Sequence, residues 1–192
     1  MASIKGSIRN LFLKHGVYKE LGIALLHKHF TIKPTERLVD FRNISAPWTI
    51  GDDDAIDAII THKHDGLILP RSFRLVDEGK LVPYEFDFSN TDWIPRFNPA
   101  FISELSDLLY ASGLDQILGL RILDKRESEL PVEITKGKMN IMIPRGVIPE
   151  SELIEALWVF GLGDDDDDRC HHRSVCRRLK NGDHYESDHS YG

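Results

Sequence analysis

Short apolar runs separated by turn-forming residues constrain this fold more than any other feature of the sequence. FRLVDEGKLVPYEFDF at 73–88 and LPVEITKGKMNIMIPRG at 130–146 both alternate apolar and polar residues around a glycine. This alternation is typical of strands, whereas a helix repeats its apolar residues every three or four positions. About seven short strands and about three helices in mixed order predict the α+β class with a mostly antiparallel sheet.

The helices are expected where apolar residues recur at helical spacing. Residues 3–15 form one amphipathic stripe that ends before a glycine, and 98–112 are opened by Asn-Pro and closed by another glycine. These are favourable start and stop signals. A helix is also predicted at 54–64, because aspartates precede it and favour a helix N-terminus. Residues 149–161 open like a helix and end like a strand.

The strands are expected from alternation and from buried apolar runs. Residues 20–32 and 36–43 are predicted to pair as a hairpin, although a helix competes for 19–28. Residues 46–54 are expected to form a loop. Within 73–88, two strands should flank the DEG turn, with Pro83 at an edge or a bulge. Residues 66–70 are a short buried apolar run, and further strands are predicted at 116–124, 130–137 and 139–146.

The chain divides by composition at about residue 163. With 41% hydrophobic residues, most of them before Gly163, residues 1–163 can bury the core of a single α+β domain. Residues 164–192 begin with five aspartates and are rich in cysteine and histidine. They are expected to be a polar tail or a small metal-bound extension.

The charge and the absence of long apolar runs limit partners and location. A net charge of −7 argues against nucleic acid, and no apolar run has the length of a membrane span. The expected partner is an unidentified protein or a small molecule. A cytoplasmic location is the default, with a mitochondrial presequence as the minor alternative because Lys5, Arg9 and Lys14 precede the first acid. Two cysteines do not make a disulfide framework.

The C-terminal segment carries the first candidate metal site. Cys170 and Cys176, with His184 and His189, are two thiolates and two imidazoles, a standard ligand set for zinc. His172 is a substitute ligand. The alternative is a disordered, solvated tail, because the segment has few apolar residues.

The pair His27 and His29 is the second candidate. On a strand, residues two apart point the same way, so two imidazoles reach one metal ion. Glu36 or Asp40 is the expected carboxylate, and Cys170 or Cys176 of a tail that folds back is a further possibility. The alternative is a pair of half-buried histidines that only make hydrogen bonds to neighbours.

The stretch from Gly22 to Glu36 is similar to part of the first motif of the cupins, G-x5-H-x-H-x3,4-E. Here the gaps before His27 and after His29 differ from that motif, and no histidine follows Pro144-Arg-Gly146 at the place of the second motif. The resemblance implies a metal-dependent enzyme.

Three functions follow from these residues. The first is zinc binding through the C-terminal cysteines and histidines, with a binding or regulatory role. The second is a metal-dependent enzyme, cupin-like or hydrolytic, that uses His27 and His29. The third is a metal-free interaction protein with a disordered acidic tail. His62 and His64, at the end of the expected helix 54–64, are more readily explained as a solvated helix end. Whether the chain is an enzyme stays open.

Overall fold

Strands predominate in the structure, a computed structural model that describes residues 4–49, 59–60, 67–76, 79–89, 96–123, 132–161 and 170–177. The helices within these ranges are α1 (Ile4–Lys14), α2 (Pro99–Ala111) and one 3₁₀ turn, η2 (Glu150–Glu152). The strands are β1 (Leu21–Leu25), β2 (Glu36–Phe41), β3 (Ile44–Thr49), β4 (Ile59–Ile60), β5 (Leu67–Val76), β6 (Lys80–Ser89), β7 (Leu118–Ile122), β8 (Val132–Lys136), β9 (Met139–Ile143), β10 (Leu153–Phe160) and β11 (Cys170–Arg177).

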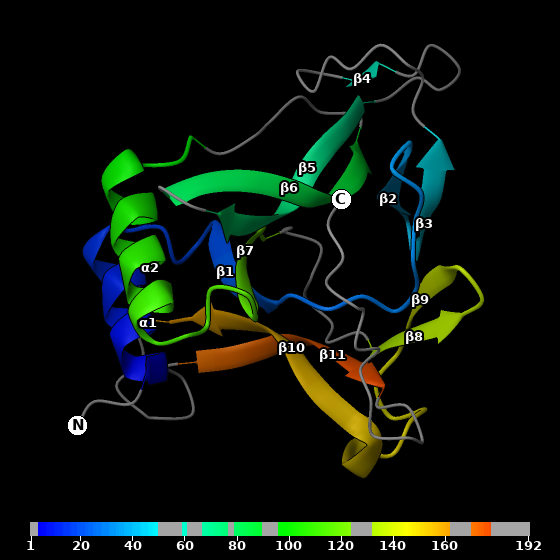
Figure 1. Cartoon of the computed structure of the whole chain (residues 1–192). Coiled ribbons are helices and arrows are strands. Elements are labelled where there is room, and N and C mark those ends of the chain that lie inside the picture. Colours follow the sequence, from blue (N-terminus) through cyan, green and yellow to red (C-terminus); the bar gives the residue numbers. More distant parts are fainter. Residues whose placement is uncertain are drawn as a thin grey trace.

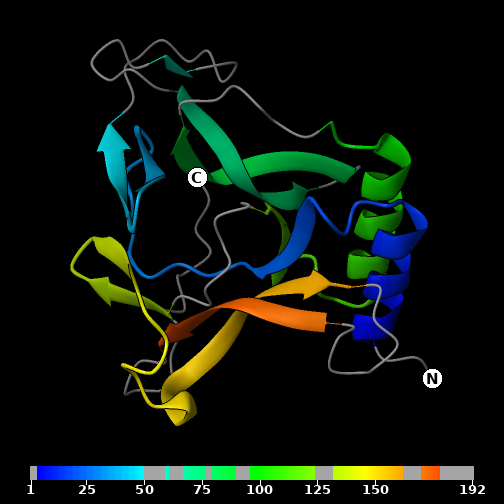
Figure 2. The same cartoon turned by 180° about the vertical axis from the view of Figure 1, so that it is seen from behind.

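The strands join in one mixed sheet that closes on itself. Its order is β4-β5-β6-β2-β3-β9-β8-β11-β10-β1-β7, and a further pairing of β5 with β7 completes a ring. β4 lies outside the ring, attached to β5. The pairs β2–β6 and β8–β11 are parallel, and the other pairs are antiparallel. Figures 1 and 2 show the strands arranged around a common centre, with both α-helices on one side.

The main apolar core lies between the two α-helices and the ring. Phe12 of α1 is fully buried, its ring 5.1 Å from Phe101 of α2 and 4.8 Å from Phe160 of β10. Phe73 and Leu120 join the same cluster from β5 and β7. The helices therefore cover the outer face of one arc of the ring. Among the described helices, none is long and apolar enough to cross a membrane.

Several local predictions are confirmed. α1 matches the helix expected at 3–15, and α2 begins after the cap Asn98, whose side chain accepts a hydrogen bond from Ala100 N at 3.0 Å. β5 and β6 pair antiparallel as expected, and the strands expected at 36–43, 116–124, 130–137 and 139–146 are β2, β7, β8 and β9. Pro83 lies beside a bulge, because the β5–β6 register shifts between Ser72 and Phe73.

The predicted α+β class with three helices is wrong. The described chain has two α-helices and is mostly strand. Residues 149–161 form a 3₁₀ turn and then β10, because Ile154, Trp158 and Val159 suit a strand that has partners on both sides, β1 and β11. Of the helix expected at 54–64, only Ile59–Ile60 are described, and they form β4.

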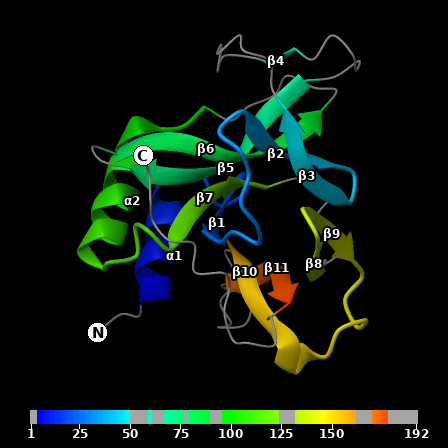
Figure 3. The same cartoon turned by 45° about the vertical axis from the view of Figure 1, so that its right-hand side comes forward.

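The predicted hairpin of residues 22–43 is also wrong. β1 ends at Leu25 and pairs with β7 and β10, which lie far away in the sequence. β2 instead forms a hairpin with β3 (Figure 3). In its two-residue turn Arg42 has a φ of 64°. Residues 46–49, expected in a loop, belong to β3. Non-local pairing decided the place of β1, and a local hairpin with β3 decided that of β2. Sequence alternation does not say which partner a strand takes.

Candidate metal centre

The inside of the ring is polar. A cavity of about 10 Å³ is lined from β2, β3, β5, β6, β7, β8 and β9, by Leu38, Asp40, Ser45, Arg71, Glu85, Phe86, Arg121, Glu133 and Met142. The alternation of strands explains how this arises, because successive side chains face opposite sides of a sheet. Leu120 packs under the helices, and its neighbour Arg121 lines the cavity.

His27 and His29 enter this interior from the segment that follows β1. The sequence predicted both histidines on a strand, and this is wrong, because β1 already ends at Leu25. His27 Nδ1 lies 2.8 Å from the carbonyl oxygen of Leu25. A carbonyl only accepts, so Nδ1 donates its hydrogen there and Nε2 is the nitrogen that faces Glu133. Metal-binding histidines usually make this kind of hydrogen bond through the nitrogen that does not bind the metal.

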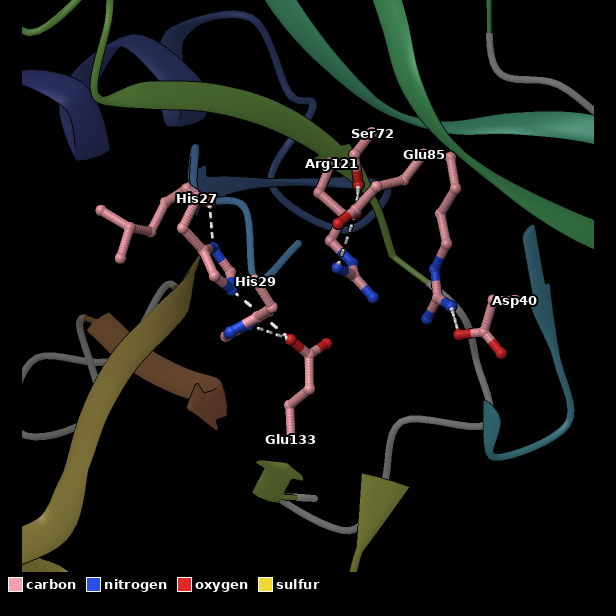
Figure 4. Close-up of polar contacts among 9 residues, drawn as sticks. His27, His29, Asp40, Ser72, Glu85, Arg121 and Glu133 are labelled. Carbon is pink, nitrogen blue, oxygen red and sulfur yellow. Dashed lines mark hydrogen bonds and ion pairs between the residues drawn. The ribbon is translucent and has the colours of Figure 1, made fainter. Parts of the chain in front are cut away.

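Glu133 of β8 meets both imidazoles (Figure 4). Its Oε1 lies 2.6 Å from His29 Nε2 and 3.5 Å from His27 Nε2. The two rings are nearly perpendicular, with centroids 4.6 Å apart. The side chains of His27, His29 and Glu133 are only 12%, 7% and 9% exposed. Three side chains of the types that bind metals thus converge at a site with little solvent exposure.

The charge of Glu133 is maintained by the histidines. Burial by itself raises the pKa of this carboxyl, but the contacts with His27 and His29 outweigh burial and hold the pKa well below its ordinary range. A buried carboxylate of this kind requires positive partners, either protonated imidazoles or a metal ion.

The arrangement fits a tetrahedral metal ion. One ligand atom from each of His27, His29 and Glu133 lies within 4.8 Å of the other two. Ligands about 2.1 Å from zinc lie about 3.4 Å from one another, so small side-chain movements suffice. Two imidazoles and one carboxylate are a ligand set that catalytic zinc sites use, and it leaves a fourth position for water.

A second polar group borders the same cavity. Arg71 Nη1 lies 2.6 Å from Asp40 Oδ2. Glu85 Oε2 accepts hydrogen bonds from Ser72 Oγ at 2.6 Å and from Arg121 Nη1 at 3.3 Å. Burial is the main reason why the pKa of Asp40 is raised to about 6, despite the nearby arginine.

The expected carboxylate partners of the histidines are not the ones found. Glu36 Oε2 accepts from the backbone N–H of Lys33 at 2.8 Å and closes a turn, and Asp40 pairs with Arg71. Glu133 was missed by the sequence reasoning. In the sequence, Glu133 alternates with Val132 and Ile134 and shares its face of the strand with Thr135, so it resembles an ordinary solvent-facing acid and gave no local signal.

The C-terminal candidates are described only in part. The backbone of Cys170, His172 and Cys176 lies in β11, and His184 and His189 are outside the described residues, as are His62 and His64. In the parallel pairing of β11 with β8, Cys176 is the register partner of Glu133. The C-terminal zinc site and the boundary at 163 therefore stay predictions.

Comparison with protein-family models, with curated proteins and with solved structures finds no match for this chain. Its function is therefore inferred from the site itself.

Proposed function

We propose that this chain binds one zinc ion inside the ring, through His27 Nε2, His29 Nε2 and the carboxylate of Glu133. The observation that carries the proposal is the convergence of these three buried side chains, with ligand atoms within 4.8 Å of one another. The hydrogen bond from His27 Nδ1 to Leu25 O also supports it, since metal-binding histidines usually donate their other N–H to such an acceptor.

Zinc suits these ligands better than the common alkaline-earth ions. Calcium and magnesium prefer six or more oxygen ligands, whereas zinc accepts imidazole nitrogen and four-coordination. Three protein ligands leave one position for a water molecule, whose pKa zinc lowers to about 7. The chemistry that this centre would supply is a metal-bound hydroxide, which favours a metal-dependent enzyme acting on a small molecule.

The first test is the metal content of the full, untagged chain, purified without chelator and measured by mass spectrometry. About one zinc per chain is expected. Changing His27 and His29 together to alanine should remove it. His15→Ala is the matched control, because His15 also contacts a carboxylate, Glu104, at 3.2 Å, and the other charged group on that carboxylate is Lys14. A double variant that keeps its zinc would overturn the proposal.

A second ligand set is retained because β11 brings the backbone of Cys176 into register with Glu133. In this version Cys170 and Cys176, with His184 and His189, hold the zinc and give the chain a binding or regulatory role. Changing both cysteines to serine separates the two proposals. Loss of zinc with intact His27 and His29 would favour the C-terminal set, and retention would favour the centre inside the ring.

A further inference from the structure

The side of the ring away from the helices carries neighbouring apolar side chains that are exposed. β2, β3, β8 and β9 lie on that side (Figure 1). Phe41 of β2, Ile44 of β3 and Met139 of β9 are 41%, 43% and 41% exposed. Phe41 pairs with Ile44, and Ile44 pairs with Ile141, two residues after Met139. Single exposed apolar side chains are ordinary, whereas neighbouring ones mark an interaction surface.

Aromatic rings and an arginine add to this surface around β2. The ring of Phe41 lies 6.4 Å from that of Trp48 in β3 and 5.3 Å from that of Phe88 in β6. The guanidinium of Arg42 lies over Phe41, 5.1 Å from the ring centre. Aromatic, methionine and arginine side chains are enriched where proteins bind one another. We call Phe41, Arg42, Ile44, Trp48, Lys136 and Met139 the outer patch.

The alternation of the strands separates the charges of the two faces. The carboxylates of β2, β3, β6, β8 and β9 stand at inward positions. Asp40, Glu85 and Glu133 line the cavity, Asp87 is the register partner of Asp40, and Glu36 stands two residues before Leu38, which also lines the cavity. Cations stand at outward positions, since Lys136 is the register partner of Met139. Arg37 likewise pairs with Trp48. The outer patch is therefore positive in a chain whose net charge is −7.

We propose that the outer patch binds an acidic segment of another protein. Apolar side chains of that segment pack on Phe41, Ile44 and Met139, and its carboxylates face Arg42 and Lys136. A short segment meets only the patch, because charges more than about 8 Å away are largely screened at physiological salt. An anionic membrane or a nucleic acid is a larger surface, which the excess of carboxylates in this chain repels. The inference does not depend on the proposed metal centre.

The test measures binding of synthetic peptides to the full chain by fluorescence anisotropy, with chelator present so that zinc cannot bridge peptide and protein. The probes are short labelled peptides that contain equal numbers of glutamate and of phenylalanine or leucine, in varied order. The same peptides with lysine in place of glutamate are the controls. The glutamate peptides should bind, the lysine peptides should not, and added salt should weaken binding. If no glutamate peptide binds, or if both sets bind equally, the proposal is overturned.

Two substitutions locate the binding. Phe41→Ser and Arg42→Glu should each weaken it about tenfold. Tyr110→Ser is the control for the first, because Tyr110 of α2 is 77% exposed outside the patch. Lys19→Glu is the control for the second, because Lys19 Nζ also lies over an aromatic ring, that of Tyr18, at 5.7 Å. Unchanged binding in both patch variants, or equal losses in the controls, would overturn the proposal. If Phe41→Ser does not fold, Arg42→Glu decides alone.

Vesicles of phosphatidylcholine and phosphatidylserine test the other anionic surface. The chain should stay in solution when the vesicles are sedimented. Sedimentation with the vesicles that Arg42→Glu abolishes, in a chain that binds no glutamate peptide, would replace the acidic protein segment by an anionic membrane and overturn the proposal.

Discussion

The two interiors of this molecule have opposite chemistry, although the same strands build both. Under α1 and α2 the side chains are apolar, with Phe12 and Phe101 in edge-to-face contact. Inside the ring they are charged. Ser72 and Phe73 are adjacent on β5, yet one binds Glu85 and the other packs under the helices. One face of a strand can therefore contribute side chains to the apolar core, while the other face contributes polar side chains to the interior of the ring.

This comparison predicts that the two interiors can be damaged separately. The largest effect is expected under the helices. Phe12→Ala removes a fully buried ring between two other rings and should lower the free energy of unfolding by about 3–5 kcal/mol. Urea unfolding measures this change. Zinc affinity of the folded variant should stay unchanged, and a loss of zinc in a chain that is still folded would show that the interiors are coupled.

Inside the ring the expected effect is on metal binding. Zinc at 100 times its dissociation constant should raise the free energy of unfolding of the wild-type chain by about 2.7 kcal/mol. Glu133→Gln keeps the shape of the side chain but removes the charge that His27 and His29 face, so this gain should largely disappear. Thermal unfolding with and without zinc is the measurement. An equal gain in both chains would place the zinc elsewhere.

The sequence reasoning predicted local features well and long-range partners poorly. The cap and the closing glycine of α2 are encoded within a few residues, and so is the antiparallel pairing of the neighbouring strands β5 and β6. β1 has its partners about a hundred residues away, at β7 and β10, so its apolar pattern could not show which strand it joins. The same holds for the ring, which closes only through β5 and β7.

The candidate metal centre shows the same contrast between local features, which the sequence predicts, and long-range contacts, which it does not. His27 and His29 were recognised because they are two residues apart, but their contact with Glu133 spans more than a hundred positions. Glu36 and Asp40 were chosen as partners because a local hairpin was expected. Once β2 paired with β3 and β6, those carboxylates faced other groups, Lys33 N and Arg71. Glu133 itself gave no local clue, because it stands on the polar side of an alternating strand, VEITK.

The pH dependence of stability should report the polar interior. The pKa of Asp40 is about 6 in the folded chain against 3.8 for an ordinary aspartate, so the folded state binds a proton that the unfolded state has lost. This contribution to stability is complete below pH 3.8 and is lost as the pH rises through 6. Its size is on the order of 2–3 kcal/mol. Urea unfolding between pH 4 and 7 should show wild type losing this amount relative to Asp40→Asn, and parallel curves would contradict it.

The smallest effect is expected at a histidine–glutamate contact that resembles the candidate centre but lies at the surface. His15 Nε2 lies 3.2 Å from Glu104 Oε1, and Lys14 Nζ lies 2.6 Å from Glu104 Oε2. The Lys14 contact is the main reason why the pKa of Glu104 is lowered, with His15 adding to it, but water surrounds the carboxylate and screens both charges. Glu104→Gln should therefore change stability little in urea unfolding and leave zinc binding as it is. Compared with Glu133→Gln, it shows how a histidine–glutamate contact behaves when the carboxylate is exposed and its second partner is Lys14. If both substitutions had equal effects on zinc binding, the interior of the ring would not be the metal centre.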